Sequence, residues 1–376
     1  MIISNTIINV PALYLKMRNI SPEKCLLFDI ETTGLSWQRS HLYLLGAVFW
    51  ENEQWTLRQW FCQRPGEEKE ILLQFSQLLK TRQWLIHFNG NTFDIPYLMH
   101  KYTFYRMEQS WEGITHLDFY QELLPYKKIL KQPHMRQKDL EIFCGIHRKD
   151  TFTGGELISC YQEYLKSGDE ELYEILTLHN REDVEGMIQL LPLLLIPELF
   201  QGRLTEQLEV TTQNFDSYVT IRLPFSGSFP VRLQTECQWY KLCVNPSECV
   251  FQIKMHSGIL RYFFPNYKDY YYLPLEDEAI HKSVGAYVDK DHREKAKASN
   301  CYKKVTGQFL PEFEPVYTPM FHMEYKDNVG WFSADSILHA ERENPRDSEL
   351  LKTYVNHLLK HVRLMKNVAE QDSFDR

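Results

Sequence analysis

The sequence predicts an α/β fold, a mixed β-sheet with flanking helices, followed by a second, β-rich α+β domain. Three observations predict this fold class. Apolar segments joined by short polar turns come first, and they are typical of an antiparallel meander. Extended and helical hydrophobic patterns then alternate, which favours a strand that lies parallel to the first one. After residue 205 the pattern changes to short strand-like segments, which indicates a separate domain.

Hydrophobic spacing assigns the elements of the first part of the chain. Strands are expected over residues 25–31, 41–50, 54–62, 84–88 and 114–119. Helices are expected over residues 68–80, 94–105, 137–145, 155–166 and 170–195. The first strand is then central in the sheet, and its edge faces the last of these helices.

The second part of the chain is expected to be rich in strands, over residues 217–225, 230–239 and 250–264. We expect the last of these to fold as a hairpin about residues 256–258. Helices are expected over residues 277–298 and 348–365. An aromatic segment at 262–272, with cations near it, is of a kind that stacks on single-stranded bases, although alternate aromatic residues also form ordinary sheet faces.

Two domains are expected, because 376 residues exceed one ordinary hydrophobic core. We place an N-terminal arm at residues 1–23, the α/β domain at 24–200 and the β-rich domain at 206–376. The longest apolar runs are too short for a membrane span. The N-terminus lacks the basic leader of a signal peptide, so a cytoplasmic location is expected.

The charge of the chain excludes one class of protein. A net charge of -8 with a pI of about 6.0 argues against a generic nucleic-acid coat, whose signature is a strongly basic face. It does not argue against an enzyme that acts on nucleic acid, because such an enzyme needs only a local basic groove and a bound cation offsets an acidic centre.

Acidic residues interrupt the apolar pattern where the first strand ends. Asp29 and Glu31 share one face of the strand, because side chains alternate with a period of two, while Phe28 and Ile30 face the other way. Two carboxylates on one buried edge repel each other unless a cation lies between them. Mg²⁺ or Mn²⁺ is the expected cation, since oxygen ligands suit these ions.

Two further segments supply polar groups to the same site. Asp94 follows a turn-like stretch at the junction between an expected strand and an expected helix. His179 and Asp183 are four residues apart on the helix expected over 170–195, so they share a face. Carboxylates in the order Asp, Glu, Asp, Asp are then available to one divalent-metal site.

These segments resemble the DEDD 3'-to-5' exonucleases of the ribonuclease-H-like superfamily, and the order of elements resembles theirs. The three matching stretches are Phe28–Leu35, Asn89–Leu98 and Leu178–Val184. The second is similar to the second exonuclease motif of family B DNA polymerase proofreading domains. A closer likeness is to the YprB-like group of ribonuclease-H-like domain proteins, in which the last motif also reads His-Asn-x-x-Asp-Val. The resemblance covers residues 24–195.

The resemblance implies a metal-dependent nuclease that trims a 3' end of single-stranded or 3'-ended DNA or RNA with two Mg²⁺ or Mn²⁺ ions. By this likeness Asp29 bridges both ions, Glu31 and Asp183 complete the first site, and Asp94 holds the second. His179 orients or deprotonates the attacking water. It stands four residues before the last aspartate, where one DEDD subclass has a tyrosine, whereas the histidine of the other subclass lies five residues before that aspartate. Residues of the first two motifs would contact the terminal nucleotide, namely Thr32, Thr33, Leu35 and Asn89.

Simpler interpretations exist for each motif alone. A single Asp-x-Glu is often structural, Asp94 can cap a helix, and His179 with Asp183 can form an exposed helical pair. Their joint occurrence, in this order, favours an active site. Asp118 is expected to be a strand-end residue, and Asp139 the N-cap of a helix through Ile146. An endonuclease on the same fold and a noncatalytic nucleic-acid-binding module remain as alternatives, as does the choice between DNA and RNA.

Overall fold

The structure is a computed structural model, and it describes residues 1–108, 111–204, 208–213, 217–338 and 345–365. The chain divides into two compact units. The first contains Met1–Pro197 with Phe229–Val231, and the second contains Glu198–Ser228 with Arg232–Arg376. Each unit is described by itself. In the part of the chain that the structure describes, no helix has the length and apolar character needed to cross a membrane.

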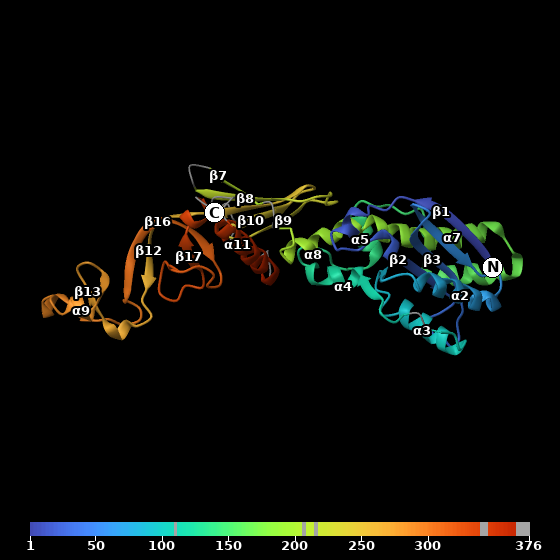
Figure 1. The fold of residues 1–376 in the computed structure, drawn as a ribbon, viewed down its shortest axis with the longest axis horizontal. Coiled ribbons are helices and arrows are strands. Elements are labelled where there is room, and N and C mark those ends of the chain that lie inside the picture. The colour runs from blue at the N-terminus through green and yellow to red at the C-terminus, as the bar shows by residue number, and fades with distance from the viewer. Residues whose placement is uncertain (109–110, 205–207, 214–216, 339–344, 366–376) are drawn as a thin grey trace. The chain divides into compact units, whose positions relative to one another are not determined.

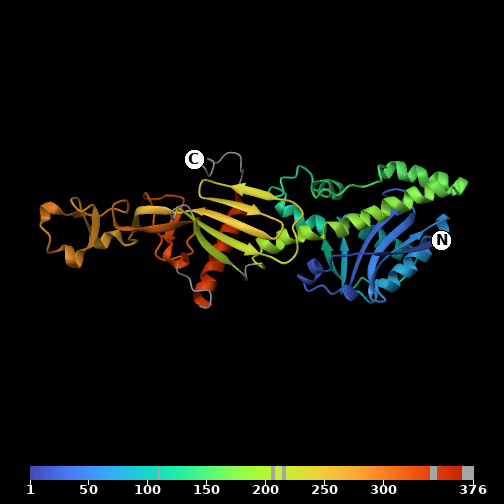
Figure 2. The ribbon, with the colours of Figure 1, turned by 90° about the horizontal axis from the view of Figure 1, so that it is seen from above.

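The first unit is built on one mixed six-stranded sheet, with the order β1-β4-β3-β2-β5-β6 (Figures 1 and 2). The strands are β1 (Ile2–Ile8), β2 (Cys25–Thr32), β3 (Leu42–Glu51), β4 (Gln54–Phe61), β5 (Trp84–His87) and β6 (Thr115–Asp118). The pairs β2–β3 and β3–β4 are antiparallel, as the meander predicted, and β5 is parallel to β2. The predicted α/β mixed sheet is therefore confirmed. The residues expected to form an N-terminal arm include β1, which pairs with β4 at the edge of the sheet.

Helices flank this sheet. The longer ones are α2 (Glu68–Leu79), α3 (Asp94–Phe104), α6 (Gly154–Ser167) and α7 (Glu170–Gln189), and the shorter ones are α1 (Leu13–Lys16), α4 (Phe119–Leu123) and α5 (Gln137–Phe143). Helix α8 (Leu195–Phe200) contains the boundary between the two units. The last helix expected in this part stops at Gln189, and a 3-10 turn (Leu191–Leu194) follows. Pro192 explains this ending, because proline lacks the N–H that a continued helix requires.

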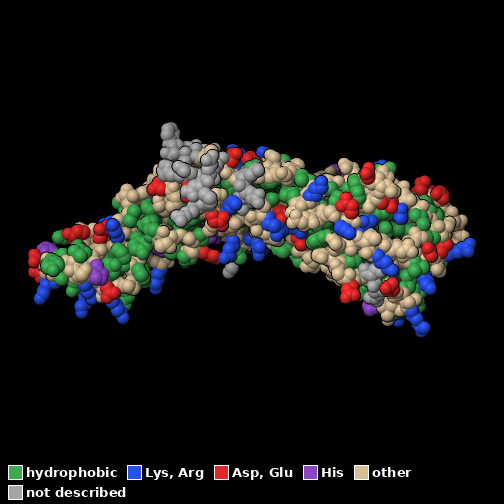
Figure 3. All heavy atoms as spheres, in the orientation of Figure 1, with side chains coloured by type: hydrophobic (Ala, Val, Ile, Leu, Met, Phe, Trp, Pro, Cys, Tyr) green, Lys and Arg blue, Asp and Glu red, His purple; other side chains and the backbone are tan. Residues whose placement is uncertain are grey.

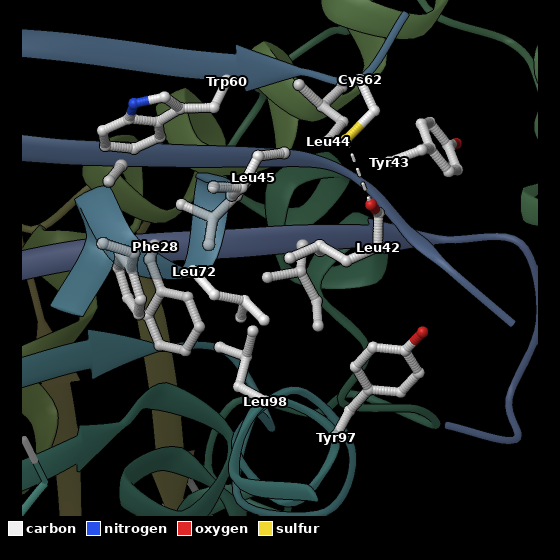
Figure 4. Packing of buried hydrophobic residues seen from close by; sticks show 14 of the residues in the cluster. Phe28, Leu42, Tyr43, Leu44, Leu45, Trp60, Cys62, Leu72, Tyr97 and Leu98 are labelled. Carbon is white, nitrogen blue, oxygen red and sulfur yellow. Dashed lines mark hydrogen bonds between the residues drawn. The ribbon is translucent and has the colours of Figure 1, made fainter. Parts of the chain in front are cut away.

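The alternation of side chains in β2 separates the core from the polar site. Phe28 packs against Phe75 of α2, with ring centroids 5.3 Å apart, and Figure 4 shows Phe28 among Leu72 and Leu98. Asp29, one residue further, faces Asn180 of α7 instead. Burial of the Phe28 side fixes the register of the strand, since a one-residue slip would turn the carboxylates into the apolar core.

The second unit is rich in antiparallel strands, which confirms the predicted β-rich domain. A five-stranded sheet has the order β7-β8-β11-β10-β9, and two three-stranded sheets have the orders β12-β16-β17 and β14-β13-β15. The strands are β7 (Glu209–Gln213), β8 (Tyr218–Pro224), β9 (Leu233–Glu236), β10 (Tyr240–Val244), β11 (Glu248–Lys254), β12 (His256–Phe263), β13 (Tyr270–Leu273), β14 (Glu278–His281), β15 (Glu294–Lys295), β16 (Tyr302–Glu312) and β17 (Gly330–Ser333). The helices are α9 (Lys282–Gly285), α10 (Asp335–Leu338) and α11 (Pro345–Leu364).

Two sequence predictions in this unit are wrong. Residues 250–264 do not form a hairpin, because β11 pairs with β8 and β10 whereas β12 pairs with β16. The helix expected over 277–298 is replaced mainly by β14, α9 and β15. Asp277 has a positive φ of 54° and closes a turn in which its N–H donates to the carbonyl of Leu273. Strand β13 pairs with β14 and with β15. Pairing with an aromatic strand therefore stabilises extended conformation here more than the helical spacing of the segment stabilises a helix.

Charged side chains are interspersed over the surface. On the face drawn in Figure 3, Lys and Arg lie among Asp and Glu in both units. This distribution agrees with the net charge of -8.

Candidate metal centre

An amide relay fixes Asp29 against α7. Asn180 Nδ2 donates to Asp29 Oδ2 at 3.0 Å, and Gln59 of β4 donates to Asn180 Oδ1 at 3.0 Å. Asn180 is fully buried, and Gly46 of β3 lies beneath it. A Cβ at Gly46 would lie 2.2 Å from Asn180 Oδ1, so glycine is required for this close approach. The relay orients Asp29 and leaves its other carboxylate oxygen for a ligand.

Among the residues that the structure describes, Glu31, His179 and Asp183 form a compact group of possible metal ligands, whose ligand atoms all lie within 4.8 Å of one another. His179 Nε2 is 3.1 Å from Asp183 Oδ2 and 3.5 Å from Glu31 Oε1. The two helical residues share a face because they are four positions apart. The strand end and the helix thus bring carboxylates and an imidazole to one point.

Asp94 is the first residue of α3, and it acts on the same cluster through its charge. That charge raises the pKa of both Asp29 and Glu31. Burial raises the pKa of Asp94 itself to about 7, and the charges of Asp183 and Asp118 add to this effect. All three predicted motifs therefore meet, although Asp94 does not belong to the compact group formed by described residues.

The electrostatics of the cluster create a demand for positive charge. Burial, followed by repulsion from neighbouring carboxylates, holds the pKa of Asp29 and of Glu31 well above the usual range. Asp183 behaves differently. Burial would raise its pKa, but hydrogen bonds and charge from His179 and Arg148 outweigh burial and lower it. A divalent cation would relieve the repulsion between Asp29 and Glu31, and oxygen donors with one imidazole suit Mn²⁺ and, for the carboxylates, Mg²⁺.

His179 is oriented from its other side. Its Nδ1 lies 2.7 Å from Asp150 Oδ2, and both side chains are buried, with 7% of His179 and 9% of Asp150 exposed. Burial lowers the pKa of His179, but Asp183 and Asp150 outweigh that effect and raise it. A carboxylate on Nδ1 fixes the ring orientation and directs Nε2 toward Glu31 and Asp183.

A second support holds Asp183. Arg148 Nη1 donates to Asp183 Oδ1 at 2.5 Å, and Arg148 Nη2 donates to Glu141 Oε1 at 2.6 Å. Glu141 is 1% exposed, and Gln137 donates both to Glu141 Oε1 and to the backbone carbonyl of Asp183. Arg148 therefore neutralises buried Glu141 while positioning the last carboxylate of the site.

Sequence reasoning did not assign roles to Asp150, Arg148, Glu141 or Gln59. Asp150 and Arg148 lie in a loop that has no hydrophobic periodicity. Gln59 lies in a strand, and its hydrogen-bond partner Asn180 comes from a distant helix that packs on the folded sheet. One usable signal was Gly186, an isolated glycine inside the helical pattern of α7, because such a glycine commonly marks close packing. Its ideal Cβ would lie 2.0 Å from Glu141 Oε1.

Gly186→Ala is expected to destabilise the protein by about 1–3 kcal/mol, because the added methyl overpacks this site and displaces Glu141. The displaced Glu141 would release Arg148 from Asp183, so any metal-dependent activity should also fall. Urea unfolding measures the first effect. Gly155→Ala in α6 is the matched control, since its Cβ meets nothing within 4 Å and should leave stability unchanged or raise it by a few tenths of a kcal/mol. Equal stability of Gly186→Ala and the wild type would contradict the close packing.

The residues expected to contact the terminal nucleotide differ in exposure. Leu35 is 86% exposed and free for contact with a ligand. Thr32 and Thr33 hold the turn after β2: Thr32 Oγ1 donates to the Gly34 carbonyl at 2.9 Å, and Thr33 Oγ1 accepts from the His41 N–H at 2.9 Å. Asn89 has a positive φ of 58°, and its N–H donates to Asp118 Oδ1 at 2.8 Å.

The two aspartates set apart from the motifs have structural positions. Asp118 ends β6, as expected, and also caps α4 by accepting from the Tyr120 N–H at 3.0 Å. The expected N-cap role of Asp139 is wrong. Arg136 occupies the N-cap position of α5, and Asp139, in the first turn, forms an ion pair of 2.7 Å with it. The helix also ends at Phe143, before Ile146.

Comparisons with known proteins agree with the fold. Residues 26–195 match the family model of the RNase_H superfamily. The matched region holds most of the mixed sheet of the first unit, whose fold is ribonuclease-H-like. No curated protein sequence matches the chain.

Similar solved structures include a polymerase and an exonuclease. The family B DNA polymerase from the hyperthermophilic archaeon Pyrobaculum calidifontis is 12% identical, with a TM-score of 0.40; the match covers 93% of this chain and 48% of the polymerase. E. coli exonuclease I in complex with a dT13 oligonucleotide is 12% identical, with a TM-score of 0.33, over 92% of this chain and 72% of the exonuclease. This chain thus spans about half the length of the polymerase.

Proposed function

We propose that the protein is a metal-dependent nuclease that hydrolyses phosphodiester bonds of nucleic acid from the 3' end. One observation carries the proposal: Glu31, His179 and Asp183 present ligand atoms within 4.8 Å of one another, beside Asp29. A noncatalytic binding module would have no reason to keep a cluster of carboxylates whose mutual repulsion opposes folding. The assignment to the DEDD class and the likeness to the YprB-like group rest on the residues of the three motifs and on their order in the chain.

Asp29, Glu31, Asp94 and Asp183 are the residues that would hold two Mg²⁺ or Mn²⁺ ions. When bound, two such ions activate an attacking water and neutralise the leaving oxygen of an in-line displacement. The raised pKa of Asp29, Glu31 and Asp94 supports this assignment, because these carboxylates lack enough positive charge of their own. The assignment of ligands to individual ions follows the resemblance of the motifs.

His179 is the residue that we assign to proton transfer. Nδ1–H donates to Asp150, and Nε2, which faces Glu31 and Asp183, is the nitrogen that would exchange a proton with water. Asp183 and Asp150 raise the pKa of His179, and a bound cation would oppose this effect, so that the imidazole would release its Nε2 proton and could accept a proton from water near neutral pH. Arg148 keeps Asp183 ionised and in place through its hydrogen bond.

The decisive assay is digestion of matched 5'-labelled DNA and RNA oligonucleotides by wild-type and Asp29→Asn protein, with Mn²⁺, Mg²⁺ or EDTA. A ladder that shortens from the 3' end, requires the ion and is lost in the variant would support the proposal. Comparison of the two substrates decides between DNA and RNA. A circular single strand and a 3'-blocked linear strand separate the modes of cleavage, because only an endonuclease opens the circle. Absence of ion-dependent cleavage of every substrate would refute the proposal.

Metal affinity is expected to fall as the pH falls below about 7. Asp94 has a folded-state pKa raised to about 7, so below that pH it carries a proton that a cation must displace. For one displaced proton the apparent affinity falls about tenfold per pH unit. The increase in Tm caused by Mn²⁺ should therefore be larger at pH 8 than at pH 6.

Variants identify the group responsible for that pH dependence. Asp94→Asn should bind Mn²⁺ more weakly and show a flatter pH dependence of the Tm increase. Asp139→Asn should behave as the wild type, because Asp139 pairs with Arg136 away from the cluster. If Mn²⁺ raised the Tm of the wild type equally at pH 8 and pH 6, competition between the metal and the proton on Asp94 would be refuted.

A further inference from the structure

Three aromatic rings gather on the surface formed by the loop after β2 and by α3. Trp37, in that loop, stacks on His100 of α3, with ring centroids 4.9 Å apart and an interplanar angle of 12°. Phe104, one helical turn further, meets the edge of Trp37 at 6.5 Å. His100 and Phe104 are exposed, Phe104 at 63%, whereas Trp37 is partly buried. We call these three residues the Trp37 platform.

A buried polar network holds the loop on the helix. Lys101 Nζ donates to the Ser40 carbonyl at 2.6 Å and pairs with Glu68 at 2.9 Å, and Glu68 is fully buried. The Ser40 hydroxyl is also 3.0 Å from the Tyr97 hydroxyl. A buried ion pair whose polar atoms have partners resists displacement, since breaking it leaves an uncompensated buried charge. The platform is therefore a fixed surface.

The platform is carried by two of the segments that also carry the candidate metal centre. Its loop begins directly after β2, the strand of Asp29 and Glu31, and its helix begins at Asp94. His100 follows Asp94 by six residues, which corresponds to roughly 9 Å along the helix axis. At about 3.4 Å per nucleotide of a stacked strand, this distance corresponds to roughly two to three nucleotides.

We propose that the Trp37 platform stacks an unpaired base of the nucleic-acid strand whose 3' end enters the metal centre. The inference rests on the proposed nuclease function. Flat rings at the surface accept any base, because every base has a π-face, and His100 supplies the exposed member of the existing stack. The platform selects single-stranded substrate, since a paired base cannot leave its duplex partner to stack there.

Binding is tested with a single-stranded oligonucleotide and Ca²⁺ in place of the catalytic ion. Trp37→Ala is expected to weaken the Kd by about 5- to 150-fold, the range for losing one base–aromatic stack. His100→Ala should weaken it in the same direction. Ile7→Ala is the control, because Ile7 is 69% exposed on the edge strand β1 and is not part of the platform. A 2-aminopurine two or three positions from the 3' end should be quenched by the wild type and less by Trp37→Ala.

Turnover of a short substrate separates this inference from the nuclease proposal. A p-nitrophenyl ester of a thymidine 5'-phosphate is too short to reach the platform, so Trp37→Ala should hydrolyse it at the wild-type rate while cleaving oligonucleotides more slowly.

Equal oligonucleotide affinity of wild type and Trp37→Ala, or no affinity in either, would overturn the platform. Loss of ester hydrolysis in Trp37→Ala would also overturn it, because Trp37 would then act on the site geometry. Failure of the wild type to cleave either substrate, with Mg²⁺ or Mn²⁺, would instead count against the nuclease. Trp37→Phe and a Tm measurement detect a folding defect.

Discussion

Asp29→Asn is expected to lower phosphodiester hydrolysis by at least about 1,000-fold, because Asp29 would be one of the carboxylates that hold the metal ions, and these ions would supply several kcal/mol of charge stabilisation. The fold should remain intact. Asn180 donates to Asp29 Oδ2, and the amide oxygen of an asparagine can accept the same hydrogen bond. Ion-dependent cleavage of a 5'-labelled oligonucleotide measures the effect. Asp139→Asn, which removes a carboxylate outside the cluster, should retain wild-type turnover.

The same variant should be more stable than the wild type in EDTA at pH 7.5. The folded-state pKa of Asp29 lies well above the ordinary value, so its ionisation opposes folding once the pH exceeds the unfolded pKa of about 4. The stability gain of Asp29→Asn should therefore shrink as the pH falls, and it should vanish at about pH 3 or below, where the carboxyl is mostly protonated in both states. Near wild-type turnover of Asp29→Asn would refute the metal centre, and lower stability at every pH would refute the electrostatic account.

His179→Ala is expected to lower turnover by about 100-fold or more, the usual scale for loss of general-base help. The position of the ring supports this role, because Nε2 lies 3.1 Å from Asp183 Oδ2 and 3.5 Å from Glu31 Oε1. A histidine that only packs on the helix would leave turnover unchanged. The exposed His147, in the loop that also carries Arg148 and Asp150, provides the control, and His147→Ala should retain wild-type turnover.

Asp150→Asn distinguishes a positioning role from a catalytic one. Asp150 contacts Nδ1 of His179, the ring nitrogen that faces away from Glu31 and Asp183. Asp150→Asn should therefore lower turnover by about 10- to 100-fold, an effect no larger than that of His179→Ala. It should also lower the pKa of His179, since Asp150 is one of the groups that raise it. The acid limb of the pH–rate profile would then move to lower pH. An unchanged limb with reduced turnover would show that Asp150 has only a structural role.

The local part of the site was predictable because period and spacing determine which side chains share a face. Asp29 and Glu31 alternate with buried Phe28 in a strand, and His179 lies one helical turn before Asp183. Asp94 was placed correctly at the start of a helix. Local spacing failed at residues 277–298, where the edge of β13 recruited strands from a segment with helical spacing.

The sequence by itself determined the mixed sheet of the first unit, the β-rich character of the second and the motif residues, because hydrophobic periodicity and motif order are properties of the chain. Only the tertiary structure decided which residues hold the motifs in place. Asp150 and Arg148 come from a loop, and Gln59 reaches Asn180 across 121 positions of sequence. Such partners depend on the packing of α7 against the sheet, with glycine at 46 and 186 where a Cβ would collide with Asn180 and Glu141. Contacts between distant segments leave no periodic trace in a single sequence, since they arise from shape and charge complementarity after the elements have packed.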